Sequence, residues 1–305
     1  MSNIFDLLIN RPMGWILNQL SNLVGGNFAL AVFLFTLLIN ILLIPLSIKT
    51  QKSSAKQAML RPKLELLKKK YGNDRLKYNE EMQKLYAQEG VSLSGGCLPL
   101  FIRLPIMMGI YYAVNNPLST LLNLPAEVVT NAKELCTQLI DRAARELDVV
   151  YHANELIDKV PELKALENIN FNLFGINLTQ TPEFSLNIFG EFQLIWIIPL
   201  LSFATAMLTS VVSMSVQKST NPDAPSLKGM MLTMPVISLI IAFSVPGAVG
   251  FYWACSNLIA GTIQVILQYV YNVNKIIATT QAQTVLKRYE TEQMKIKRVQ
   301  NGEQS

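Results

Sequence analysis

Residues 97–114 read Cys-Leu-Pro-Leu-Phe-Ile-Arg-Leu-Pro-Ile-Met-Met-Gly-Ile-Tyr-Tyr-Ala-Val, an apolar stretch with a single charge at Arg103. A charge in the middle of a bilayer costs roughly 2.5–3.5 kcal/mol on insertion scales, so such a residue usually faces a bundle interior or a wet cavity. The stretch offers Arg103 no carboxylate at helical spacing. We therefore predict a membrane span whose lone cation awaits a partner.

The composition favours a membrane protein. The chain has 305 residues, of which 50% are hydrophobic and 15% charged, and a hydrocarbon core needs about 20 apolar residues per helix. Residues 229–274 carry no charge but are too long for one crossing at about 1.5 Å per residue, and Pro246-Gly247 divides them. We predict an all-α membrane protein with five spans, at residues 28–48, 97–114, 192–216, 229–245 and 248–269.

The loop charges predict the orientation of the chain. Residues 49–96 hold 11 Lys/Arg against 5 acids, and residues 115–191 hold 5 against 11. The short loop 217–228 and the tail 270–305 hold 2 against 1 and 6 against 3. Since five spans place the three positive segments on one side, and positive loops stay in the cytoplasm, we expect the N-terminus outside and the tail in the cytoplasm. The net charge of +5 thus reflects the concentration of positive residues on the expected cytoplasmic side. It does not indicate a nucleic-acid partner, and no DNA partner is expected.

The cytoplasmic segment 49–96 has the pattern of a basic helical hairpin. Residues 57–71 place Leu60, Leu64 and Leu67 on one face, and residues 74–89 do the same with Leu76, Met82, Leu85 and Tyr86. A turn at 71–74 with Asp74 as N-cap would join the two helices. The basic outer face is either solvated or a contact for anionic lipid headgroups or ribosomal RNA. Its lysines are Lys52, Lys56, Lys63, Lys68, Lys69 and Lys70.

The segments outside the membrane have weaker signals. Residues 1–27 are expected to form an amphipathic helix in the outer interface. In the acidic outer loop, residues 125–147 and 150–167 suggest two amphipathic helices split by Asp148, and residues 170–190 are turn-like or extended. No histidine or cysteine has metal-ligand spacing, so neither a metal nor a cofactor is expected.

Polar residues recur at helical spacing on three of the predicted spans. Either they support close helix packing through interhelical hydrogen bonds, or they converge with Arg103 on one hydrated cavity. The candidates are Thr36, Asn40 and Ser47 on the first span, Thr205 and Thr209 on the third, and Asn257 and Gln264 on the fifth.

Sequence motifs of enzymes are missing. We find no phosphate-binding G-x-x-x-x-G-K-[ST] loop, no H-E-x-x-H and no G-x-S-x-G, and the predicted spans hold no acid to serve as a general base. The chain is therefore not expected to be an enzyme, and no catalytic residue is predicted.

Several motifs together resemble the YidC/Oxa/Alb family of membrane protein insertases. They are Ile41-Leu-Leu-Ile-Pro45-Leu46, Met59-Leu-Arg-Pro-Lys63, Gly95-Gly-Cys-Leu-Pro-Leu-Phe-Ile-Arg-Leu-Pro-Ile106 and Pro246-Gly-Ala-Val-Gly-Phe-Tyr-Trp-Ala-Cys-Ser-Asn-Leu258. The likeness covers most of Phe28–Gln268, except the outer insertion 116–168. It implies a bacterial plasma (inner) membrane protein with five helices around a hydrophilic groove, open to the cytoplasm and to lipid.

The chain departs from the family pattern at the groove cation. The family usually has an arginine in the first span, five residues before the proline of the Pro-Leu pair, and this chain has Asn40 there. It has Arg103 where the family commonly has glutamine. We interpret this as relocation of the charge to the second span, with Asn40 as a neutral neighbour. The alternative is that Arg103 only snorkels to the cytoplasmic edge.

The resemblance implies that the chain draws acidic or polar parts of nascent membrane proteins into the groove and releases hydrophobic segments to lipid. The expected partners are nascent membrane proteins, the lipid bilayer and, weakly through the basic hairpin and tail, the ribosome; work beside the Sec translocon is left open. Two other functions stay open: a small-solute channel or carrier, and a structural membrane chaperone that does not need Arg103.

Overall fold

The structure is a computed structural model that describes residues 9–90, 98–184, 193–220, 227–270 and 273–300. Contacts divide the chain into two units. Unit 1 comprises Met1–Leu43, Pro99–Met214 and Ala224–Thr262, and unit 2 comprises Ile44–Leu98, Ser215–Asp223 and Ile263–Ser305. Each unit is described on its own.

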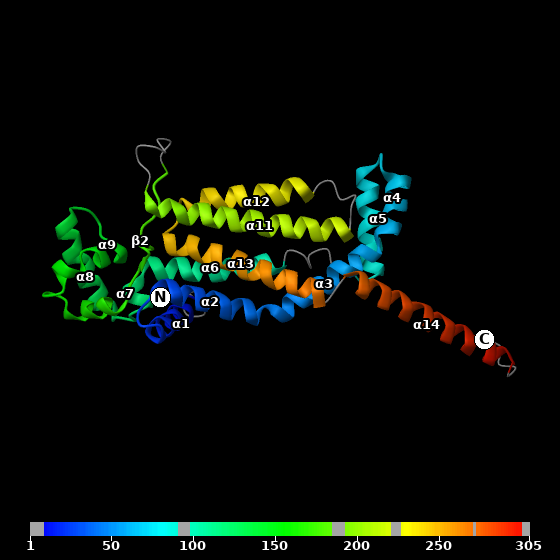
Figure 1. Cartoon of the computed structure of the whole chain (residues 1–305), viewed down its shortest axis with the longest axis horizontal. Helices are drawn as coiled ribbons and strands as arrows, with labels where there is room; N and C mark the ends of the chain where they lie inside the picture. Colours follow the sequence, from blue (N-terminus) through cyan, green and yellow to red (C-terminus); the bar gives the residue numbers. More distant parts are fainter. Residues whose placement is uncertain (1–8, 91–97, 185–192, 221–226, 271–272, 301–305) are drawn as a thin grey trace. The chain divides into compact units, whose positions relative to one another are not determined.

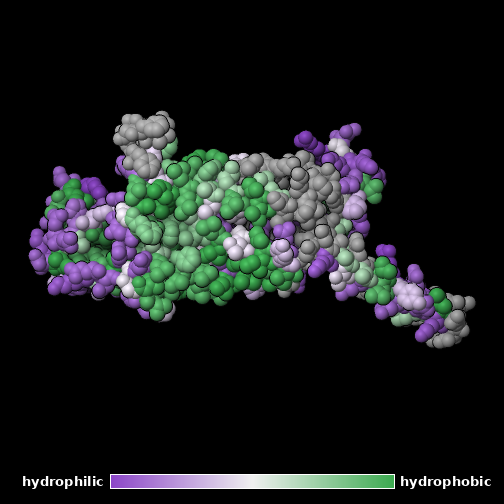
Figure 2. Space-filling view, in the orientation of Figure 1, coloured by the Kyte–Doolittle hydropathy of each residue, from purple (hydrophilic) through white to green (hydrophobic). Residues whose placement is uncertain are grey.

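Long apolar helices form the larger part of unit 1 (Figure 1). They are α1 (Arg11–Leu23), α2 (Phe28–Leu42), α6 (Leu98–Asn115), α11 (Ile197–Thr220), α12 (Leu227–Ala242) and the first part of α13 (Gly247–Val270). The short helix η4 (Leu194–Trp196) leads into α11. In the space-filling view, the surface over the long helices of this unit is largely apolar (Figure 2).

Two helices among the described residues are long and apolar enough to cross a membrane, at Leu194–Met214 and Gly247–Val270. A third results if α2 and the following α3 (Ile44–Met59) are one bent span. The chain is thus mostly helical with candidate spans, as the sequence predicts. The arrangement of five spans stays a prediction.

The core of the long helices is apolar and closely packed. Its fully buried side chains include Leu17, Phe28, Phe35, Ile110 and Val114. The first helix packs through Leu17, whereas the Trp15 side chain on the same helix is 63% exposed. A helix at Arg11–Leu23 lies within the stretch 1–27 for which an interfacial amphipathic helix is expected. Its place at a membrane interface stays a prediction, and residues 1–8 lie outside the described residues.

The outer insertion has its own core in unit 1. It contains α7 (Pro117–Thr120), α8 (Ala126–Ile140), α9 (Glu146–Tyr151), α10 (Ala153–Leu156) and the 3₁₀ helix η3 (Pro161–Asn168). Their buried side chains form a second apolar cluster, separate from that of the long helices. Asp148 was expected to split two helices, and this prediction is wrong. The residue lies inside α9, where its carboxylate accepts the main-chain N–H of Arg145 at 2.8 Å. The split lies earlier, at Asp141, whose φ of 52° ends α8.

A two-stranded antiparallel hairpin follows the insertion. Its strands are β1 (Asn172–Leu173) and β2 (Ile176–Asn177), with Leu173 opposite Ile176. The chain after β2 then reaches the start of α13, where the N–H groups of Gly247 and Ala248 donate to the carbonyls of Gln180 and Leu178, both at 2.8 Å. The turn-like character predicted for residues 170–190 is confirmed for its described part.

Unit 2 contains the predicted cytoplasmic hairpin. Helices α4 (Arg61–Tyr71) and α5 (Arg75–Gln88) pack against each other, and the side chain of Asp74 caps α5 by accepting the N–H of Lys77 at 3.1 Å. The expected helix 57–71 is divided near Leu60, because Pro62 starts a new helix and cannot continue the preceding one. Leu76 is 85% exposed and so lies outside the apolar seam.

The tail forms a single helix, α14 (Val273–Gln300), which packs against α3 in unit 2. The sequence analysis predicted a basic tail without assigning its secondary structure. Several large apolar side chains of α14 are exposed, including Leu286 and Tyr289, both at 60%.

Candidate functional site

Arg103 lies on α6, two residues before a proline inside that helix. The residue is partly buried, and it lies close enough to the buried Tyr252 of α13 to interact with it electrostatically. Among the residues that the structure describes, Arg103 forms no ion pair.

Thr36 and Asn40 are buried on α2, at 0% and 5% exposure. The Thr36 hydroxyl donates to the Val32 carbonyl at 2.6 Å, and the Asn40 amide donates to the Thr36 carbonyl at 2.8 Å. Both donors are thus used inside their own helix. The described part of the chain shows no hydrogen bond between Asn40 and Arg103, and the exchange of these two positions stays a hypothesis.

The polar positions on α11 and α13 meet directly. The Thr209 hydroxyl donates to the Thr205 carbonyl at 2.9 Å and to the Asn257 carbonyl at 3.2 Å. One turn further along α13, a Cβ at Gly261 would lie 3.2 Å from the Thr209 hydroxyl. The polar residues were expected either to support close helix packing or to line a hydrated cavity. Around Thr209 and Asn257 they support helix packing.

The remaining predicted groove residues, Ser47 and Gln264, belong to unit 2 and are both partly buried. Each has an interaction partner. The eight predicted groove residues are therefore divided between the units, with Arg103, Asn40, Thr36, Thr205, Thr209 and Asn257 in unit 1.

All six lysines predicted on the hairpin are exposed, with Lys52 and Lys56 on α3 and the others on α4. Lys63 forms an ion pair with Glu89, and Lys70 lies 5.0 Å from the centre of the Tyr71 ring. A hydrogen bond with Tyr71 raises the pKa of Lys70, so this lysine stays charged. A pocket of about 320 Å³ between α4 and α5 combines apolar side chains, such as Leu66, with lysines.

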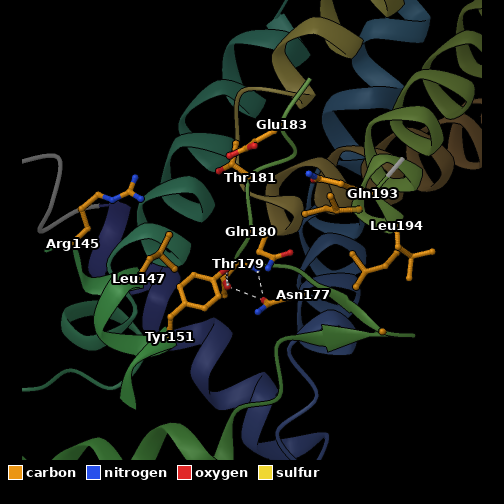
Figure 3. A pocket seen from close by; sticks show the side chains of 13 residues that line it. Arg145, Leu147, Tyr151, Asn177, Thr179, Gln180, Thr181, Glu183, Gln193 and Leu194 are labelled. Atoms are coloured by element: carbon orange, nitrogen blue, oxygen red, sulfur yellow. Dashed lines mark hydrogen bonds between the residues drawn. The ribbon is translucent and has the colours of Figure 1, made fainter. Parts of the chain in front are cut away.

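A larger pocket, of about 500 Å³, opens beside the outer insertion (Figure 3). Its walls come from α9, from β2 and the residues after it, and from η4. Tyr151, Thr179 and Asn177 meet in its floor: Thr179 donates to Tyr151 at 3.0 Å and to Asn177 at 2.7 Å. Arg145, Glu183 and Gln193 also line it. The sequence carries no local signal of this pocket, because its lining residues come together only through tertiary contacts.

One wall of the pocket is held by ionic contacts of α9. Asp148 accepts two hydrogen bonds from the Arg142 guanidinium, at 2.7 and 3.1 Å. Burial raises the pKa of the Asp148 carboxyl, but the hydrogen bonds from Arg142 and from the Arg145 backbone outweigh this effect, so the pKa is lowered. Glu146 accepts the N–H of Ser119 at 3.0 Å, which ties α9 to α7. The described residues contain no cluster suited to a metal ion.

Comparison with known proteins gives a family match over most of the chain. The sequence model described as "60Kd inner membrane protein" matches residues 19–275. This range contains the predicted span of resemblance, Phe28–Gln268, and continues through the outer insertion.

Individual relatives match either a short part of the chain at higher identity or a longer part at lower identity. A "Membrane protein insertase YidC" from Alkalihalophilus pseudofirmus is 43% identical over 110 residues, which are 34% of this chain and 44% of that protein. One from Neisseria meningitidis serogroup B is 38% identical over 103 residues, 34% of this chain and 19% of that protein. A "Membrane protein insertase YidC 2" from Listeria innocua is 26% identical over 251 residues, 81% of this chain and 66% of that protein. The chain thus spans less than two thirds of each of these relatives.

Proposed function

The chain belongs to the 60Kd inner membrane protein family, that of the YidC/Oxa/Alb insertases, and on that basis we propose that it inserts proteins into a bacterial membrane. Its relatives in the comparison carry the name of membrane protein insertase. The proposed substrates are nascent membrane proteins, and the proposed product is a hydrophobic segment released to lipid.

The observation that carries the mechanism is the state of Arg103. Its guanidinium is partly buried, next to Tyr252, and forms no ion pair with any described carboxylate. We infer that an acidic or polar segment of a nascent chain supplies the missing partner. The attraction between two unit charges is worth about 4 kcal/mol at 4 Å and an effective dielectric constant of 20. Desolvation reduces this value, so the contact is transient and the chain can leave.

The neighbouring polar residues have a supporting role in this proposal. Thr36 uses its hydroxyl donor within α2, and Asn40 uses one N–H of its amide there. Thr209 holds α11 against α13. In this proposal Arg103 supplies the attraction for the acidic segment of the substrate. The polar residues of α2, α11 and α13 lower the free-energy cost of keeping the charge of Arg103 within the bundle.

The basic hairpin is the proposed point of first contact on the cytoplasmic side. Its exposed lysines favour anionic lipid headgroups or ribosomal RNA, and the pocket between α4 and α5 adds apolar side chains between those charges. Under this proposal the tail and the hairpin attract the ribosome weakly. The proposal is compatible with a chain that acts together with the Sec translocon.

Complementation tests the proposal in cells depleted of their own insertase. The wild-type chain should restore insertion of single-span substrates with acidic N-terminal tails, and Arg103→Gln should not. The double variant Arg103→Gln/Asn40→Arg should restore insertion if the cation can work from either span. Normal insertion by Arg103→Gln would overturn the role of Arg103 and favour a chaperone that uses only apolar faces. Solute flux through liposomes that hold the purified chain would favour a carrier.

A further inference from the structure

The hairpin of β1 and β2 ends in an unusual residue. Phe174 and Gly175 form its two-residue turn, with φ angles of 49° and 85°. Turns with two positive φ angles favour Asn-Gly or Gly-Gly, because a bulky side chain is strained there. The Phe174 side chain is also 95% exposed. The turn thus holds a large, exposed apolar group in a strained conformation, and the described residues give it little contact to offset the strain.

The backbone fixes where this side chain lies. Asn170, just before β1, donates its N–H to Gly26 at 2.8 Å and accepts the N–H of Phe28 at 3.0 Å. The rings of Phe171 and Phe28 are 4.9 Å apart. Since Phe28 is the first residue of α2, the base of the hairpin is attached to the start of a predicted span.

The tip lies beside the start of a second span. A Cβ at Gly175 would be 3.7 Å from a methyl group of Leu194, which is ordinary contact distance. Leu194 begins the candidate membrane span Leu194–Met214, and its side chain is 47% exposed. Phe174, the residue before Gly175, therefore lies near the first residue of that candidate span and adds a second exposed apolar side chain there.

We propose that Phe174 is a lipid anchor, whose ring enters the interfacial zone of the leaflet that meets this end of unit 1. Under the predicted orientation this is the outer leaflet. Large apolar side chains, Phe among them, are buried at the boundary between headgroups and acyl chains by elements that lie in the interface, and burial of the ring in lipid would offset the strain of a positive φ angle at a residue other than glycine. The anchor would set the depth of the starts of α2 and α11.

The anchor requires only that the chain spans a membrane, so it stands apart from the proposed insertase activity. A different occupant of the same surface would be the apolar segment of a substrate. We favour lipid because Phe174 precedes Gly175, and the position of Gly175 is in contact with Leu194, the first residue of a candidate span.

Spin labelling of the full chain in nanodiscs of zwitterionic and anionic phospholipid tests the proposal. In a background with Cys97, Cys136 and Cys255 replaced by Ala, single labels are placed at Phe174→Cys and, as a control, at Leu139→Cys. Leu139 is also an exposed apolar residue of the outer loop, at 46% exposure. The ratio of oxygen to nickel-chelate accessibility should be several-fold higher at position 174 than at position 139.

A second variant separates anchoring from misfolding. Phe174→Asn suits the turn better than phenylalanine does, so the fold should persist. A label at Asn172→Cys, also exposed, should then become more accessible to the nickel chelate than in the chain that keeps Phe174.

Equal accessibility at positions 174 and 139 would overturn the anchor, as would no change at position 172. Protection of position 174 only when a stalled nascent chain is added would also overturn it, in favour of substrate contact. Since insertion in depleted cells is measured separately, loss of the anchor and loss of insertase activity can be told apart.

Discussion

Thr209 of α11 donates a hydrogen bond of 3.2 Å to the main-chain carbonyl of Asn257 in α13. Removal of the hydroxyl in Thr209→Val should lower the stability of the bundle by about 0.6 kcal/mol, the average for such bonds between membrane helices. Thr209→Ser keeps the hydroxyl and is the matched control. Thermal unfolding in detergent measures both variants. An unchanged midpoint for Thr209→Val would show that this bond does not hold the helices.

Arg103 should act on the charge of the substrate. In Arg103→Gln, insertion of a substrate with an acidic N-terminal tail should fall about tenfold, which corresponds to about 1.4 kcal/mol. The same substrate with its acids changed to amides should insert equally well with either chain. Arg103→Lys keeps the charge and should retain most of the activity. Protease protection of radiolabelled substrates in proteoliposomes measures the six combinations of three chains and two substrates, and equal losses for both substrates in Arg103→Gln would mean that Arg103 has only a structural role.

The turn between α1 and α2 contains two glycines that should respond differently to alanine. Both have positive φ angles, 67° at Gly25 and 83° at Gly26. A Cβ at Gly25 meets nothing within 4 Å, whereas one at Gly26 would lie 2.1 Å from the Asn168 carbonyl oxygen. Gly25→Ala should cost about 1–2 kcal/mol through its backbone angle alone.

Gly26→Ala should cost more than Gly25→Ala, because the backbone of residue 168 must also move. It should also loosen the base of the hairpin, since the Gly26 carbonyl accepts the N–H of Asn170. Hydrogen exchange at Asn170 provides the measurement. Equal exchange in the two variants would contradict this account of the turn.

The outer insertion should lose stability in acid. Because the pKa of Asp148 is lowered in the folded state, its contribution is present above the ordinary Asp pKa of about 3.9 and is lost as the pH falls through the folded value. Asp148→Asn should remove about 1.5–3 kcal/mol at neutral pH, since it breaks hydrogen bonds between charged groups. Asp141→Asn, at an exposed residue, is the control.

Limited proteolysis of residues 126–168 between pH 7 and pH 3 would follow this loss. The difference in sensitivity between wild type and Asp148→Asn should shrink as the pH falls towards the lowered pKa of Asp148. A constant difference between them across the whole range would mean that Asp148 acts through packing and not through its charge.

The basic hairpin should show a salt-dependent contact. Replacement of Lys68, Lys69 and Lys70 by Gln should weaken binding to ribosomes or to anionic vesicles by at most about 1 kcal/mol for each charge, and the difference should shrink as salt is added. The same change at three lysines of the outer loop, Lys133, Lys159 and Lys164, is the control. Co-sedimentation and vesicle flotation measure the two contacts, and equal effects of both triple variants would exclude a specific role for the hairpin.

Local signals in the sequence predicted part of this structure well. The Asp74 cap and the pairing of two hairpin helices depend on residues a few positions apart, and both were found. Asp148 was misread as a helix break, because its ion pair with Arg142 depends on how the loop folds back. Nor could helical periodicity show that Leu17, and not Trp15, would face the core.

The residues of the candidate site could be predicted from the sequence, but their arrangement in space could not. A charged residue in an apolar span has a high free-energy cost and therefore indicates a functional site. For this reason Arg103 could be predicted from the sequence. The meeting of Thr209 with Asn257 and Gly261 depends on the relative rotation of two helices. The pocket lined by Arg145 and Gln193 draws on segments far apart in the chain and has no linear pattern.

The start of α13 takes its acceptors from main-chain carbonyls of Leu178 and Gln180. Since every residue type has such a carbonyl, the exposed side chain of Gln180 can change without releasing the helix, whereas Leu178 and Thr179 are buried. Two of these residues, Thr179 and Gln180, line the outer pocket. A designer could therefore place a new recognition residue at position 180, on the wall of the pocket, while α13 keeps its main-chain contact.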